Sequence, residues 1–266
     1  MRYALLSDIH ANLPALEAVL ADLDGRNDVD GIWHLGDLVG YAPWPNEVVA
    51  LLSERGVGGV AGNYDSTVAT DYKHCGCRYE DDRQEQLAHA SYEWTRSNVS
   101  AGTRAALAAL PFRIELRAGG GHRSGATAIL VHGTPTLNTV DWTADRDEDF
   151  CRRMAQAAGA RAGDLIAFGH THLPWTRVVD EVTFVNAGSV GRPKDGDPRA
   201  GYVVVELSGS APRVEFRRVA YDVSRTVRAI EASELPDEFG SYVESGGRSL
   251  DRTPASPKTP AMESTS

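Results

Sequence analysis

The chain has 266 residues, which is enough for one large α/β domain with a sizeable core or for two small domains. Its formal net charge of −10 at pH 7 argues against a general nucleic-acid binder, because that role usually needs a basic face. Three cysteines without framework spacing argue against a secreted disulfide scaffold, and no apolar run approaches the length of a membrane span. We therefore expect a cytoplasmic protein.

The first half of the chain alternates strand-like and helix-like segments. Short apolar runs predict strands, and apolar residues at helical spacing predict the helices between them. Asn12 and Pro14 fit the start of the first helix, and Gly25 fits its end. We expect strands at 3–6, 31–35 and 57–61, helices from about 13 and from 45, and mostly helical structure over 64–110.

The second half is richer in strands and predicts the layering of the fold. Strands are expected at 112–116, 127–131, 165–168, 176–179, 183–185, 202–207 and 213–219, with helices at 147–158 and 223–232. This order favours two packed mixed sheets flanked by helices, a four-layer α/β/β/α sandwich. We expect a single domain over 1–245 with a helical insertion at about 66–110. Ser, Thr and Pro predict a disordered tail over 246–266.

Polar side chains cluster where the predicted strands end. In open α/β sheets, ligands gather at the carboxyl ends of strands, so separate segments can deliver these side chains to one place. The set consists of Asp8 and His10, Asp37, Asn63 and Asp65, His132, and His170 and His172.

The chemistry of this set fits a pair of divalent transition metals. Imidazole and carboxylate ligands suit Mn, Fe, Zn, Ni or Co without any thiolate. Two such metals can activate a hydroxide nucleophile and clamp a phosphoryl group for in-line attack. Asp8 and Asp37 supply only two negative charges, so a loaded site stays positive and attracts a phosphate ester.

Five separated motifs carry a family resemblance. They are Asp8-Ile9-His10, Gly36-Asp37, Gly62-Asn63-Tyr64-Asp65, His132 and Gly169-His170-Thr171-His172. In this order they resemble the calcineurin-like metallophosphoesterase family, and residues 186–193 are similar to its small bacterial branch. The resemblance runs from the first strand to about residue 235. It implies a double β-sandwich in which Asp8, His10 and His172 hold one metal, Asn63, His132 and His170 hold the other, and Asp37 bridges both.

The sequence departs from that family at Tyr64. Many members have His directly after the Asn, where it is thought to protonate the leaving group. Some bacterial relatives have Cys there and tend to prefer phosphodiesters with good leaving groups. A tyrosine is a weaker acid than an imidazolium, so we expect slow leaving-group protonation, or protonation by another group such as His74 or His89. Asp65 is expected to orient the turn.

The expected catalytic set is Asp37, Asn63, Tyr64, Asp65 and His132, and the expected substrate contacts are Asn63, Tyr64, His74 and Arg192. For Arg192 and its neighbour Lys194, an exposed turn is an equal alternative. The segment Cys75-Gly76-Cys77 beside His74 has three interpretations. It is most simply a packed loop, it resembles half of a structural zinc site, and its position after Asn63 also suits a lid over the substrate.

The leading hypothesis is a phosphodiesterase or phosphatase that hydrolyses small phosphodiesters or phosphomonoesters with a metal-activated hydroxide. The alternatives are a phosphoprotein phosphatase and a non-catalytic metal-binding scaffold of the same fold. The acidic composition disfavours a nuclease. We expect a small phosphate-ester substrate and no membrane partner, and small members of the family are often homo-oligomers.

Overall fold

The computed structural model describes residues 1–77, 81–117, 125–207 and 211–248. One five-stranded sheet has the order β10-β9-β1-β2-β3. In it, β1 (Arg2–Leu6), β2 (Gly31–His34) and β3 (Gly58–Gly59) run parallel. On the other side of β1, β9 (Ala200–Glu206) and β10 (Arg213–Val219) pair antiparallel.

The second five-stranded sheet has the order β4-β5-β6-β8-β7. Its parallel centre consists of β5 (Thr127–Leu130), β6 (Leu165–Phe168) and β8 (Val182–Asn186). The antiparallel edge strands are β4 (Ile114–Arg117) and β7 (Trp175–Val179). Both sheets are thus mixed, and each contains a parallel run whose carboxyl ends can carry ligands.

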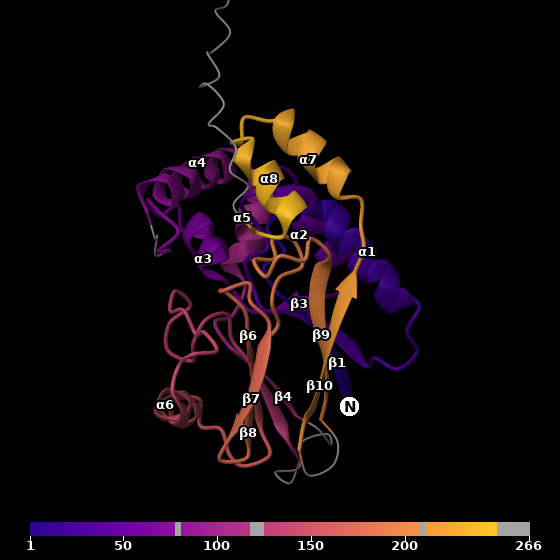
Figure 1. Cartoon of the computed structure of the whole chain (residues 1–266), viewed down its shortest axis with the longest axis vertical. Coiled ribbons are helices and arrows are strands. Elements are labelled where there is room, and N and C mark those ends of the chain that lie inside the picture. Colours follow the sequence, from indigo (N-terminus) through magenta and orange to yellow (C-terminus); the bar gives the residue numbers. More distant parts are fainter. Residues whose placement is uncertain (78–80, 118–124, 208–210, 249–266) are drawn as a thin grey trace, which may run out of the picture.

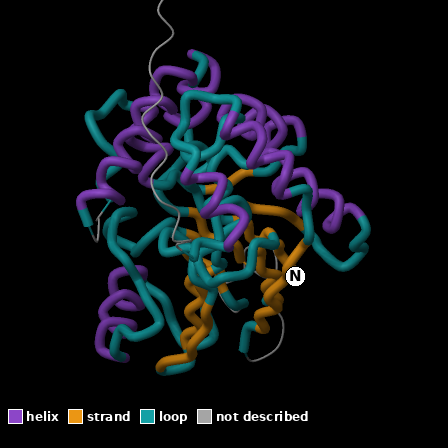
Figure 2. The backbone as a smooth tube through the Cα atoms, turned by 45° about the horizontal axis from the view of Figure 1, so that its top comes forward, coloured by secondary structure: helices purple, strands orange, loops and turns teal. Residues whose placement is uncertain are grey.

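Most of the helices lie together, whereas α6 (Glu148–Ala158) stands apart beside the second sheet (Figures 1 and 2). The other helices are α1 (Leu13–Asp24), α2 (Pro45–Glu54), α3 (Asn63–Ala69), α4 (Asp82–Asn98), α5 (Ala101–Ala108), α7 (Val223–Glu231) and α8 (Glu238–Ser245). Asn12 caps α1 as expected, since its side chain accepts from the Ala15 N–H at 3.3 Å. No described helix is long and apolar enough to cross a membrane.

Alternating side chains along the strands define the layers. In β1, Leu5 packs between the two sheets, while Ala4 and Leu6 pack toward α1 and α2. In β6, Ala167 faces the space between the sheets and Phe168 faces α6. Because each central strand buries both faces, the strands read as continuous apolar runs. The expected four-layer, single-domain arrangement of two packed sheets flanked by helices is confirmed.

Some element boundaries differ from expectation. The strand expected at 57–61 pairs only at Gly58–Gly59, because the Ala61 N–H donates to the Pro111 carbonyl instead of continuing along β2. Helix α8 was not predicted. The expected helical insertion contains α4 and α5, together with most of α3. The Gly-rich segment 118–124 and most of the expected tail lie outside the described residues.

Candidate metal centre

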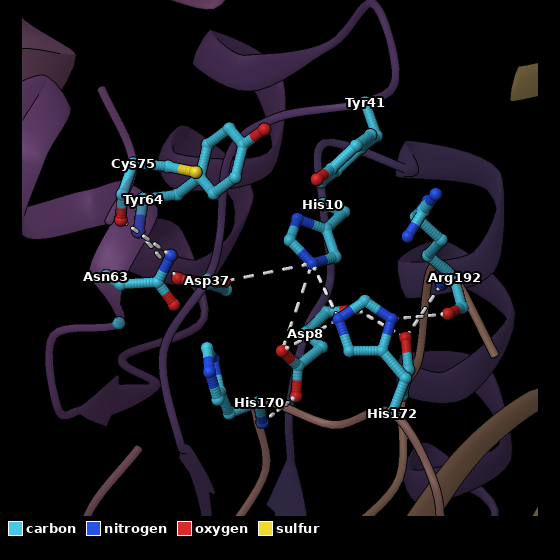
Figure 3. A network of polar contacts seen from close by, with 12 residues as sticks. Asp8, His10, Asp37, Tyr41, Asn63, Tyr64, Cys75, His170, His172 and Arg192 are labelled. Atoms are coloured by element: carbon cyan, nitrogen blue, oxygen red, sulfur yellow. Dashed lines mark hydrogen bonds and ion pairs between the residues drawn. The ribbon is translucent and has the colours of Figure 1, made fainter. Parts of the chain in front are cut away.

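The turns after five strands bring the predicted ligands to one place. Two groups of three side chains could each hold a metal ion, because the ligand atoms within each group all lie within 4.8 Å of one another. The first group is Asp8, His10 and His172, and the second is Asp37, His132 and His170. Figure 3 shows Asp8, His10 and His172 pointing toward one another, with Asn63 on the far side of Asp37. These turns follow β1, β2, β3, β5 and β6, so the carboxyl ends of both parallel runs meet at this edge.

The backbone at these turns is held in an uncommon conformation. Five of the seven predicted ligand residues have a positive φ, which L-residues rarely adopt. The values are 52° at Asp8, 48° at His10, 55° at Asp37, 68° at His170 and 61° at His172. Such a concentration of strained residues costs free energy that the surrounding fold must supply, and it is typical of functional sites.

Hydrogen bonds to backbone carbonyls fix the tautomers of three imidazoles. The Nδ1 atom lies 3.0 Å from the Val39 oxygen in His10, 2.6 Å from the Arg192 oxygen in His172 and 2.8 Å from the Leu35 oxygen in His132. A carbonyl oxygen can only accept, so Nδ1 carries the hydrogen in each ring. When it is neutral, each ring therefore presents the lone pair of Nε2 to the centre, as metal-binding histidines commonly do.

The two oxygens of the Asp8 carboxylate have different surroundings. Oδ2 accepts from the Ser7 hydroxyl at 2.6 Å and from the His170 N–H at 3.0 Å. Oδ1 is buried without a hydrogen-bond partner, 3.2 Å from His172 Nε2 and 3.8 Å from His10 Nε2. An unsatisfied anionic oxygen among imidazole lone pairs fits a bound cation.

Asp37 lies between the two groups. Its Oδ1 accepts from the Tyr64 N–H at 2.9 Å, while its Oδ2 is 3.8 Å from His10 Nε2 and 3.5 Å from His132 Nε2. One oxygen thus faces a histidine of each group, the place that a bridging carboxylate would take. Asp65 holds the surrounding turn, because its carboxylate accepts the N–H groups of Asp37 at 2.8 Å and Leu38 at 2.9 Å.

The side chain of Asn63 is oriented by the loop at Cys75. Its Nδ2 donates to the Cys75 carbonyl at 3.1 Å, and its Oδ1 lies 3.0 Å from His132 Nε2. The amide oxygen therefore faces the second group, as a metal ligand would. The sulfurs of Cys75 and Cys77 are joined in a disulfide, and Cys75 is buried. This arrangement fits the packed-loop interpretation rather than half of a zinc site.

The comparison with known families decides the assignment. A family model described as the calcineurin-like phosphoesterase superfamily domain matches residues 1–210. The chain belongs to the calcineurin-like phosphoesterase superfamily. Helices α7 and α8 lie beyond the matched residues.

Similar proteins span nearly the whole chain. An uncharacterised protein of Methanocaldococcus jannaschii is 29% identical over 259 residues, covering 89% of this chain and 95% of that protein. The crystal structure of a metallophosphoesterase from Sphaerobacter thermophilus has 29% identity and a TM-score of 0.69, covering 92% of this chain and 99% of the other. A hypothetical protein of Pyrococcus horikoshii shares the fold, with a TM-score of 0.78 at 21% identity over 94% of this chain and 99% of its own.

The candidate metal centre strongly perturbs the pKa values of His10, His132 and His172. Burial lowers the pKa of His10 to about 3, and burial together with the nearby charges of Lys194 and Arg192 lowers that of His172 well below its usual value. Burial also opposes protonation of His132, but the charge and hydrogen bond of Asp37 outweigh it and raise its pKa to about 9. His10 and His172 are therefore deprotonated and ready for a metal at neutral pH, whereas a metal must displace a proton from His132.

Tyr64 lies beside the candidate ligands but is badly placed to act as an acid. Its side chain is buried, and its hydroxyl points away from Asp8 and His172 toward Ser91 Oγ, 3.4 Å away (Figure 3). Burial raises the pKa of Tyr64 well above its usual value. The phenol therefore holds its proton more tightly than a free tyrosine does, and it would be slow to release it to a leaving group.

The remaining expected substrate contacts divide into two groups. Arg192 and Lys194 line the cavity beside the centre, together with Asn63 and Tyr64. His74 and His89 are exposed and do not line it. His74 Nδ1 accepts from the Gly76 N–H, and His89 approaches Glu85 at 4.0 Å.

Several residues that shape this cavity or its ligands carry no recognisable sequence motif. Asp141 lies 3.3 Å from His170 Nε2, and Tyr41, Phe239 and Tyr242 form aromatic walls. Ser7, adjacent to Asp8, could have been found from its position at a strand end. The two residues of α8 carry no motif, and only the packing of the chain brings them to the cavity.

Proposed function

We propose that this protein is a dinuclear metal-dependent phosphodiesterase that hydrolyses small phosphodiesters. Asp8, His10 and His172 would hold one divalent metal, and Asn63, His132 and His170 the other, with Asp37 shared. When bound, such a pair supplies an activated water nucleophile and neutralises charge on the phosphoryl group. The observation that carries the proposal is the buried, unsatisfied Oδ1 of Asp8 facing the Nε2 atoms of His10 and His172.

The acid–base groups around the cavity favour diesters with good leaving groups. The histidines that line its described part, His10, His170 and His172, all belong to the two candidate ligand groups. Tyr64 is buried with a raised pKa. A substrate whose leaving group departs without a proton therefore suits this site better than an alkyl phosphomonoester does.

The test uses metal-stripped protein reloaded with Mn²⁺, with metal content measured directly. Hydrolysis of bis-p-nitrophenyl phosphate is compared with that of p-nitrophenyl phosphate. We expect faster diester cleavage, reduced by at least about tenfold in Asp37→Asn. Faster monoester cleavage would contradict the diester preference. If two metals bind and neither ester is cleaved, the enzymatic proposal fails and a metal-binding scaffold becomes the better description.

A further inference from the structure

A cavity of about 430 Å³ lies beside the candidate metal centre. This volume is within the usual range for small-molecule sites. Candidate ligands line part of it, and residues of α4 and α8 line another part. Arg192 and Lys194 also line it, so the described wall includes two cations near the place where phosphate would bind.

Arg192 holds its charge in this cavity without a carboxylate partner among the described residues. Its Cζ lies 4.0 Å from the centroid of the Tyr41 ring and 5.2 Å from that of Tyr242. Its Nε is buried with no hydrogen-bond partner. Most other described arginines form ion pairs, as Arg26 and Arg152 do with two or more carboxylates each. The N–H groups of Arg192 therefore remain available for an anion.

The backbone fixes Arg192 next to the metal centre. Its carbonyl accepts from His172 Nδ1 at 2.6 Å, and its N–H donates to Ser189 Oγ at 2.8 Å. Tyr41, which contacts the guanidinium, also contacts the His10 ring edge-on, with centroids 4.9 Å apart. Figure 3 shows Arg192 and Tyr41 on the same side of His10 and His172. The cation is thus one aromatic ring away from the first ligand group.

Helix α8 completes the subsite with an aromatic wall. Phe239 and Tyr242 line the cavity, and Phe239 packs edge-on against Tyr41 with centroids 5.2 Å apart. The helix is anchored to α4 and α7 through an apolar cluster that includes Leu87 and Ile230. Since α8 lies beyond the matched residues 1–210, this wall is an addition to the family domain.

We infer that Arg192 and Lys194 form a second anion subsite, so that the substrate is a diphosphate diester rather than a simple diester. One phosphate would lie at the metals, the other on Arg192 and Lys194, and an organic group such as a nucleoside against Phe239 and Tyr242. This inference rests on the proposed function. It also accounts for Tyr64, because a departing phosphate needs no proton when a guanidinium stabilises its charge.

The proposed hydrolysis needs only the diphosphate diester and water as reactants. Water attacks the first phosphorus, and the bond from that phosphorus to the bridging oxygen breaks. The electron pair stays on the bridging oxygen, which leaves as part of a phosphate monoester held by Arg192 and Lys194. The attacking water loses its protons to solvent, and the products are two phosphate monoesters.

The test compares two diesters that differ in the second anion. ADP-ribose carries two phosphates, and the p-nitrophenyl ester of thymidine 5′-phosphate carries one. The quantity measured is the kcat/KM for ADP-ribose divided by the kcat/KM for the thymidine ester, both with Mn²⁺-loaded protein. We expect Arg192→Gln to lower this ratio by about tenfold or more, because a charged hydrogen-bonding partner is lost. An unchanged ratio would overturn the inference.

Matched variants distinguish loss of the anion subsite from a general loss of activity. Tyr242→Ala removes a ring that holds Arg192 and should lower the ratio, whereas Tyr242→Phe keeps the ring and should restore it. Arg228→Gln, on the exposed side of α7, should leave the ratio unchanged. Equal loss in Tyr242→Phe and Tyr242→Ala would contradict the role of the ring.

A binding measurement keeps this inference distinct from the proposed function. If metal-loaded protein cleaves neither of these diesters nor bis-p-nitrophenyl phosphate, the proposed function fails, and the α,β-methylene analogue of ADP is titrated into the same protein by calorimetry. About tenfold weaker binding to Arg192→Gln than to wild type would still support the anion subsite. Equal affinity would exclude it. If both diesters are cleaved with no preference for two phosphates, the function stands and the subsite fails.

Discussion

Asp8 Oδ1 lies 3.2 Å from His172 Nε2, and the hydrogen of the neutral imidazole is on the opposite nitrogen. Two electron-rich atoms this close in a buried space repel each other unless a cation joins them. We therefore expect divalent metal to stabilise the fold. Mn²⁺ at a hundredfold excess over its dissociation constant should raise the free energy of unfolding by about 2.7 kcal/mol for each occupied site, measured by urea titration with and without EDTA.

The matched controls for this stabilisation are two aspartate variants. Asp8→Asn keeps the shape of the side chain but removes its charge, and it should lose most of the gain from Mn²⁺. Asp24→Asn removes an exposed carboxylate that pairs with Arg55 and should keep the gain. Equal stabilisation of both variants would show that the metal acts elsewhere.

Gly169 allows the β6 turn to approach Asp8, and a methyl group there should disrupt the centre. A Cβ at Gly169 would lie 1.9 Å from Ser7 Oγ and 2.4 Å from Asp8 Oδ2. We expect Gly169→Ala to destabilise the fold by about 1–3 kcal/mol and to reduce metal content, measured by urea unfolding and elemental analysis. Gly102→Ala is the control, since only Ser100 Oγ lies near its Cβ, at 3.8 Å. Full metal content in Gly169→Ala would contradict the close approach.

The sequence predicts the ligand constellation because each candidate ligand directly follows a strand. Asp8, Asp37 and His132 needed only the position of a strand end and the rule that such ends meet. Their partners are harder to predict. The backbone carbonyl groups of Val39 and Cys75 orient His10 and Asn63. Every residue has such a carbonyl, so the sequence does not show which ones serve as partners.

The aromatic residues that line the cavity could not be predicted from the sequence for a different reason. Tyr242 is 201 residues from Tyr41 in the chain, yet both contact Arg192. Their meeting depends on how α8 packs against α4 and α7, which no local pattern encodes. Helix α8 is also only eight residues long and contains a glycine, so its intrinsic helical signal is weak.

Tyr64→His should restore an acid beside the leaving group. The present phenol is buried with a raised pKa, whereas an imidazole titrates near neutral pH. We expect turnover of aryl phosphodiesters with poor leaving groups to rise by roughly tenfold or more, and turnover of good ones to change little. The measurement is the slope of log kcat against leaving-group pKa at constant metal content. Parallel slopes for wild type and variant would contradict a missing acid.

His34 gives a pH dependence that is separable from metal binding. It is the last residue of β2 and is buried, its Nδ1 has no hydrogen-bond partner, and burial lowers its pKa to about 4. Because the folded state disfavours the charged ring, protons bind preferentially to the unfolded chain once the pH falls below about 6.5. The proton-linked cost of this residue is therefore negligible at neutral pH. It removes up to about 3 kcal/mol of stability as the pH falls from about 6.5 through about 4.

The measurement is the free energy of unfolding in urea with EDTA, at several pH values between 7.5 and 4.5, for wild type and His34→Gln. Titration of the metal-free ligand histidines is common to both proteins and cancels in the difference. Relative to wild type, His34→Gln should gain about 2–3 kcal/mol by pH 4.5, since it has no ring to protonate. His89→Gln, at an exposed position of α4, should follow the wild-type curve. If the His34→Gln curve runs parallel to wild type, the buried ring is not the source of the acid sensitivity.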